Sequence, residues 1–75
     1  MKLYLLRPIK KWTPWYDKCF GFVIRAAGEE DAREAAAARA GDEGSRVWLD
    51  PTQVSCEELT NEGEAKIIMK DFASA

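Results

Sequence analysis

Residues 28–41 have the strongest secondary-structure signal in the chain and restrict what the remaining residues can form. Acidic residues fill the first turn of this segment, where negative charge complements the positive end of a helix dipole. Gly28 is placed to cap the helix, Arg39 lies in its last turn, and Gly41 is placed to end it. We therefore predict one α-helix at about residues 29–40.

The face of this helix that should meet the core consists of methyl groups. Its residues are Ala32, Ala35, Ala36 and Ala40. Because alanine buries little apolar area, the helix must lie close against a sheet, with its charged side towards water. The residues predicted on that outer side are Glu30, Arg33, Glu34 and Ala37. Glu29 and Arg33 are also spaced for an i,i+4 ion pair.

Other segments have the apolar alternation, or the β-branched and aromatic composition, that is typical of strands. They are residues 2–7, 19–26, 46–50 and 65–72. In the second of these, Phe20, Phe22 and Ile24 share the face that should meet the core.

Residues 52–59 have two interpretations. Val54 and Cys56 suit an edge strand, whereas Ser55 and Glu58 match a capping box that would begin a helical turn. We favour a strand or an irregular connection.

Together these elements predict an α+β fold. The chain should form a single small domain over residues 1–75, with a mainly antiparallel sheet of three to five strands and the helix packed on one face. If the strands on either side of the helix are neighbours, their crossover should be parallel and right-handed; otherwise the sheet is wholly antiparallel.

The sequence lacks the groups that most catalytic and metal sites use. Histidine is absent, and Cys19 and Cys56 are the only cysteines, so a structural zinc site cannot be assembled from this chain alone. Neither cysteine has a neighbouring base to activate it. We expect two buried thiols, with a single disulfide bridge between them as the alternative. The prediction is a non-enzymatic protein with no catalytic residues, no metal and no cofactor.

No apolar run approaches the roughly 18 residues of a membrane-spanning helix. The hydrophobic stretch near the start is also too short for a secretion signal. These features predict a cytoplasmic protein that does not associate with membranes.

Charge is distributed unevenly along the chain, although the net charge is only −2. Residues 1–25 have six basic residues and one acid, residues 26–45 have two and six, and residues 46–75 have three and six. These counts give +5, −4 and −3 respectively. The acidic residues that could form a negative face are Glu29, Glu30, Asp31 and Glu34 on the helix, Asp42, Glu43 and Asp50 near its far end, and Glu57, Glu58, Glu62 and Glu64 later. Of these, the predicted steering set is Glu29, Glu30, Glu34, Asp42 and Glu43. Such a face could compete for a basic nucleic-acid-binding groove by placing carboxylates where phosphates would otherwise lie.

The basic part of the chain contains an aromatic loop, residues 10–18. Its rings, Trp12, Trp15 and Tyr16, lie among lysines and could stack on nucleic-acid bases if exposed. Alternatively, the rings cover apolar surface that the slender helix leaves open. We favour a lid of this kind with at least one ring accessible to a partner. The sequence pI near 5.1 argues against a dedicated nucleic-acid binder.

Five segments, "PWYDKCFGFVIRA", "AREAAAARAGDEG", "VWLDP", "SCEEL" and "KIIMKDF", together resemble a group of small uncharacterised proteins of phages, prophages and other mobile elements. The resemblance extends from Leu5 to the end of the chain, and Gly28 replaces the serine expected before the helix, which weakens the cap. The group has no catalytic residues to transfer, so the resemblance implies a biological context. By analogy of size and lifestyle with anti-CRISPR proteins, it implies a phage-encoded inhibitor of a host defence complex that acts by steric and electrostatic occupation of a binding surface.

The predicted partner is therefore a host protein or ribonucleoprotein complex in the host cell cytoplasm. Direct nucleic-acid binding through the aromatic loop ranks second. A structural or self-associating protein, in which an exposed edge strand pairs with a second copy, ranks third, and the chain should be a monomer or a weak homodimer. The predicted partner-binding residues are Trp12, Trp15, Tyr16, Glu29, Glu30, Glu34, Asp42 and Glu43.

Overall fold

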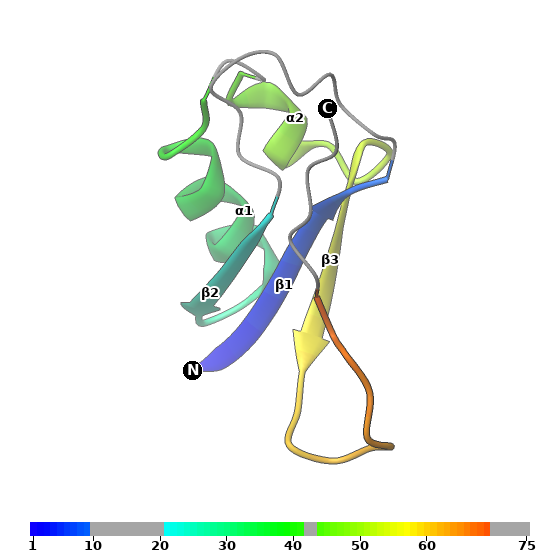
Figure 1. Ribbon diagram of the computed structural model, residues 1–75. Helices are drawn as coiled ribbons and strands as arrows, with labels where there is room; N and C mark the ends of the chain where they lie inside the picture. Colours follow the sequence, from blue (N-terminus) through cyan, green and yellow to red (C-terminus); the bar gives the residue numbers. More distant parts are fainter. Residues whose placement is uncertain (10–20, 42–43, 70–75) are drawn as a thin grey trace.

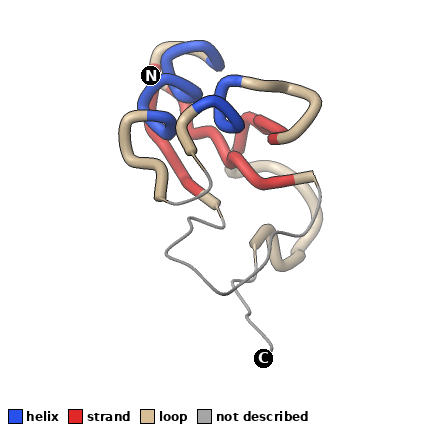
Figure 2. The backbone as a smooth tube through the Cα atoms, turned by 90° about the horizontal axis from the view of Figure 1, so that it is seen from above, coloured by secondary structure: helices blue, strands red, loops and turns tan. Residues whose placement is uncertain are grey.

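The computed structural model describes residues 1–9, 21–41 and 44–69, and all structural statements below concern these ranges. Their elements are β1 (Lys2–Pro8), β2 (Phe22–Ala26), α1 (Glu29–Ala37), α2 (Arg46–Leu49) and β3 (Val54–Leu59). The strands form an antiparallel sheet in the order β2-β1-β3 (Figure 1). Both helices lie on one side of the sheet (Figure 2). The predicted α+β class is confirmed. Of the two predicted sheet arrangements, the structure has the wholly antiparallel one.

The register of β1 shows which of its residues bond to each neighbour. Ile9 donates its backbone N–H to the carbonyl of Gln53 at 2.8 Å, one step beyond the paired ends of β1 and β3. Because bonding alternates along an antiparallel strand, odd-numbered β1 residues bond to β3 and even-numbered ones to β2. The missing N–H of Pro8 therefore faces the β2 side. Pairing with β2 ends at Leu6, whereas pairing with β3 continues to Pro8.

The main core lies between the sheet and the helices. Its buried residues are Tyr4, Leu6, Ala26, Ala32, Ala36, Trp48 and Val54. Trp48 of α2 has no exposed surface and meets the ring of Phe22 edge-on, with ring centroids 4.7 Å apart. The indole supplies the volume that the alanines of α1 lack, and the edge-to-face geometry favours the pair further. Phe22 and Ile24 pack against this core, as predicted.

The opposite face of the sheet is covered by the segment that follows β3. Leu5, which alternation places on this face, is only 1% exposed. Arg7 donates from Nη1 to the carbonyl of Ile68 at 3.3 Å, which ties the returning segment to β1. A Cβ atom on Gly21 would collide with the end of the Met69 side chain, so glycine permits this close approach.

Helix α1 differs from the prediction at its end and on its outer side. It begins at Glu29 with Gly28 as N-cap, but it ends at Ala37 and the chain leaves through a turn in which Arg39 donates to the carbonyl of Ala36 at 3.0 Å. Arg39 and Gly41 therefore lie beyond the helix. On the helix itself Ala35 is exposed, Ala37 is half-buried against the core, and Arg33, predicted on the outer side, is buried.

Two strand predictions are wrong. Residues 46–50 contain the short helix α2, in which Trp48 donates to the carbonyl of Ser45 and Asp50 to that of Val47, each at 3.2 Å. The described part of residues 65–72 crosses the face of the sheet without strand pairing. Residues 54–59 form β3, so the favoured strand interpretation is correct and the capping box is not formed. Cys19, Phe20 and residues 70–72 lie outside the described residues.

The role of Trp48 predicts a large effect of its removal. Trp48→Ala should lower the free energy of unfolding by about 3–5 kcal/mol, because it leaves a cavity at the centre of the core. Leu49 follows on the same helix but is 48% exposed, so Leu49→Ala should change stability by less than about 1 kcal/mol. Urea unfolding of both variants measures the difference. Equal losses would contradict the assignment of Trp48 as the main filling of the core.

Candidate functional site

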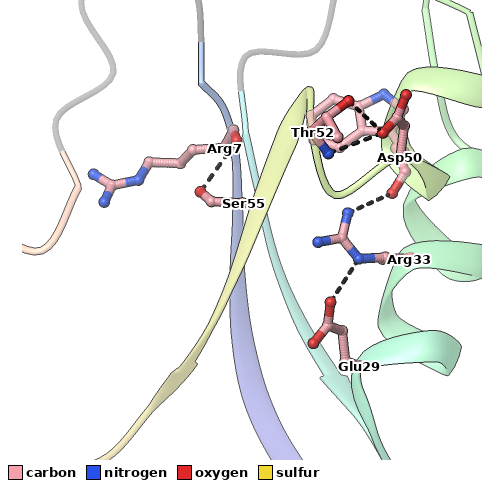
Figure 3. Close-up of polar contacts among 7 residues, drawn as sticks. Arg7, Glu29, Arg33, Asp50, Thr52 and Ser55 are labelled. Carbon is pink, nitrogen blue, oxygen red and sulfur yellow. Dashed lines mark hydrogen bonds and ion pairs between the residues drawn. The ribbon is translucent and has the colours of Figure 1, made fainter.

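The guanidinium of Arg33 lies between the two helices and is 8% exposed. Its Nε donates to Glu29 Oε2 at 2.9 Å, one helical turn earlier, which confirms the predicted ion pair (Figure 3). Its Nη1 donates to the backbone carbonyl of Trp48 at 3.2 Å. The guanidinium therefore joins the first turn of α1 to the end of α2, where helix carbonyls have no partner within the helix.

The inward position of Arg33 leaves only carboxylates among the charged side chains on the outer surface of α1. We call this set the acidic face; its members are Glu29, Glu30, Asp31 and Glu34, and all are exposed. Among the described residues, only Glu29 of this set has an ion-pair partner. The last turn of α1 contains no basic residue. The outer surface of α1 therefore carries concentrated negative charge.

Of the acidic face, Glu29 acts electrostatically on Cys56 of β3. The thiol of Cys56 is free and half-buried on the helix side of that strand. Burial raises the pKa of Cys56, the nearby Glu29 carboxylate raises it further, and Arg33 acts in the opposite direction. The thiol stays protonated near neutral pH and is a poor nucleophile. Further along β3, Glu58 pairs with Lys2 at 3.4 Å, and both side chains are largely exposed.

The carboxylate of Asp50 has a structural role between α2 and β3. Its Oδ1 accepts hydrogen bonds from the backbone N–H of Thr52 at 2.9 Å and from the Thr52 hydroxyl at 2.6 Å (Figure 3). Its Oδ2 accepts from Gln53 Nε2 at 3.3 Å. The hydrogen bonds from Thr52 lower the pKa of Asp50, so the turn is bonded to an ionised carboxylate. Asp50 is thus committed to the turn and does not add to the acidic face.

The structure brings part of the predicted site together. Glu29, Glu30 and Glu34 lie exposed on one helix together with Asp31, which the sequence also placed in the negative face. The burial of Arg33 had no such signal, because the carbonyl of Trp48 that attracts it lies on another element. The remaining predicted residues lie outside the described residues and stay predictions: Trp12, Trp15, Tyr16, Asp42 and Glu43.

A shallow depression of about 290 Å³ follows β3, and its lining residues are Thr60, Asn61, Glu62, Gly63, Glu64, Lys66 and Ile68. Within residues 1–9, 21–41 and 44–69, no cluster of three or more potential ligand side chains is arranged to hold a metal ion. No helix in these ranges is long and apolar enough to cross a membrane.

Comparison of the chain with protein-family models, with curated proteins and with solved structures found no match in any of the three. What the protein does must therefore be inferred from its own residues. The acidic face is the most concentrated arrangement of charge that the described residues present, and it suits binding to a basic surface.

The hydrogen bonds of Arg33 predict that its charge stabilises the fold. Arg33→Met keeps much of the side-chain volume but removes both hydrogen bonds, and it should lower the free energy of unfolding by about 2 kcal/mol. The loss should stay below that of a fully buried ion pair, because Glu29 is 55% exposed and can be hydrated. Arg25→Met, at an exposed arginine of β2, is the matched control and should be nearly neutral. Equal effects in urea unfolding would show that the position of Arg33 contributes no stability.

The raised pKa of Cys56 predicts that its thiol reacts slowly with alkylating reagents near neutral pH. In a Cys19→Ser background, the rate of alkylation by iodoacetamide should rise with a midpoint above the ordinary thiol value of 9.0. The folded protein favours the protonated thiol, so this group adds to the free energy of unfolding at pH values below 9.0. That contribution is lost as the pH rises through the higher pKa of the folded state. Glu29→Gln should move the midpoint down, since the Glu29 carboxylate raises it. A midpoint at or below 9.0 would contradict this environment.

Proposed function

We propose that the chain is a non-enzymatic protein-binding module, a phage-encoded inhibitor of the anti-CRISPR type that occupies a basic surface of a host defence complex. It acts in the host cytoplasm, and its partner is a host protein or ribonucleoprotein complex. The observation that supports this proposal is the inward-pointing, buried side chain of Arg33. Its position leaves carboxylates as the only charged groups on the outer surface of α1.

The acidic face has the form that such an inhibitor requires. Glu30 and Glu34 are one helical turn apart, which places their Cβ atoms about 5–6 Å from each other on a rigid element. A row of fixed negative charges fits a groove whose lysines and arginines normally contact phosphates. Charge complementarity speeds the encounter with such a groove and disfavours acidic partners. Occupation of the groove by the folded chain then excludes the nucleic acid without any chemical step.

The experiment compares capture of host proteins by the wild-type chain and by Glu30→Lys/Glu34→Lys. Both side chains are exposed, so the double variant should fold normally while reversing half of the acidic face. We expect a host protein that binds the wild type, binds the variant at least about tenfold more weakly, and is displaced by duplex DNA or RNA. Its affinity for the wild type should also fall with added salt more steeply than its affinity for the variant.

A matched control replaces Ala35 and Ala38, which are also exposed on or just after α1, with glutamine. This variant changes the same surface without changing its charge and should bind as the wild type does. Equal binding of the partner to the wild-type and charge-reversed chains would contradict the proposal. So would tighter binding of the purified chain to a single-stranded oligonucleotide than to any host protein, which would favour direct nucleic-acid binding instead.

A further inference from the structure

Strand β3 forms one edge of the sheet and has an unpaired side within the described residues. The sheet order β2-β1-β3 leaves β3 bonded to β1 alone. The segment that follows β3 loops beyond the end of the strand and returns to the sheet, where Ile68 bonds to Arg7, and its described residues do not pair with β3 (Figure 1). An unpaired edge presents backbone N–H and C=O groups that can accept another strand.

The register identifies which groups of β3 point outwards. The carbonyl of Gln53 accepts a hydrogen bond from Ile9, which directly follows β1. Because hydrogen bonding alternates along an antiparallel strand, the backbone groups of Ser55, Glu57 and Leu59 also point towards β1. The residues between them, Cys56 and Glu58, direct theirs away from the sheet. The N–H of Val54 also lies on this side but already donates to the carbonyl of Asp50 at 3.0 Å. The edge therefore offers two free N–H groups, two residues apart.

The charge around this edge selects its partner. Glu57 and Glu58 lie on opposite faces of β3 and both are exposed, while Glu29 of the acidic face lies close enough to Cys56 to affect its pKa. A second copy of β3 would bring its own Glu57 and Glu58 into the same short ladder, which like-charge repulsion disfavours. An incoming strand with lysine or arginine on both faces would instead meet Glu57 on one side and, on the other, Glu58, whose exposed pair with Lys2 at 3.4 Å it would share.

From these observations we propose that the β3 edge binds an extended basic segment of the partner as an additional strand. This inference rests on the proposed function and specifies how the partner is held: backbone bonds at Cys56 and Glu58 fix the segment, and the surrounding carboxylates select its charge. The outward-directed residues of the opposite edge, Val23 and Arg25 of β2, include no carboxylate, so that strand lacks the charge that Glu57 and Glu58 supply on β3.

The test uses a short synthetic peptide in which pairs of lysines alternate with pairs of valines, so that an extended strand carries lysine on both faces. The control peptide has glutamate in place of every lysine. Amide hydrogen exchange of the wild-type chain should slow at Cys56 and Glu58 when the basic peptide is added and stay unchanged with the acidic one. The outward amides of β2, at Val23 and Arg25, should not respond. Binding of the basic peptide without added protection at Cys56 and Glu58 would overturn the inference.

Two variants at one position separate backbone bonding from charge. Glu58→Gln retains the outward N–H and removes the carboxylate, so it should weaken peptide binding only a few-fold, as expected for an exposed charge. Glu58→Pro also removes the N–H, which β1 does not use, and should weaken binding by about tenfold more. Unchanged protection of the Ser55 and Glu57 amides in the proline variant shows that the β1–β3 ladder is intact.

The two proposals fail in different ways. If Glu58→Pro binds the peptide as tightly as Glu58→Gln does, the strand-addition inference is wrong. The proposed function still stands in that case, provided that Glu30→Lys/Glu34→Lys loses the host partner. If the charge-reversed variant keeps the host partner, the proposed function is wrong whatever happens at β3.

Discussion

The guanidinium of Arg33 is the contact on which the arrangement of the helix layer depends. It draws together a carboxylate of α1 and the carbonyl at the end of α2, and α2 holds Trp48 in the core. A four-residue helix has little stability of its own, so its place is fixed by the buried indole and by this bond to Arg33. The same contact removes the only basic side chain of α1 from the outer surface. Arg33 therefore contributes both to the stability of the helix layer and to the charge of the surface of α1.

This arrangement explains how an alanine-rich helix can cover the core of so small a protein. Ala32 and Ala36 let α1 approach the sheet closely, and Trp48 fills the space beside them. Because packing occupies only one side of α1, its opposite side is free to concentrate negative charge. Residues after β3 contact the second face of the sheet, and the edge of β3, which carries Glu57 and Glu58, is the region where outward backbone groups and charge coincide.

The sequence predicted elements whose signals are local. An apolar and aromatic run identified β1, alternation identified β2, and the acidic first turn with its following alanines identified α1. The predictions failed where a distant element decides the outcome. Arg33 borders the buried stripe of its helix, and only the carbonyl of Trp48 makes the inward position favourable. The β-forming composition of residues 46–49 indicated a strand, but four residues are too few to show a period, and burial of Trp48 determines their conformation.

The segment after β3 shows the same limit. Its apolar run, including Ile67 and Ile68, resembles a strand because periodicity cannot distinguish pairing at an edge from crossing a face. The candidate site was partly predictable from the sequence, because Glu29, Glu30 and Glu34 share one helix. The outward direction of the backbone N–H groups of Cys56 and Glu58 follows only from the register of β3 with β1.

The central claim is that carboxylates of α1 form the surface that contacts the partner. Carbodiimide cross-linking tests it most directly, because this reagent joins a carboxylate to a lysine amine only where the two are in contact. For a complex between the chain and its captured partner, the account predicts cross-linked peptides at Glu30, Asp31 or Glu34. A stable complex whose cross-links map only to residues away from α1 would contradict it.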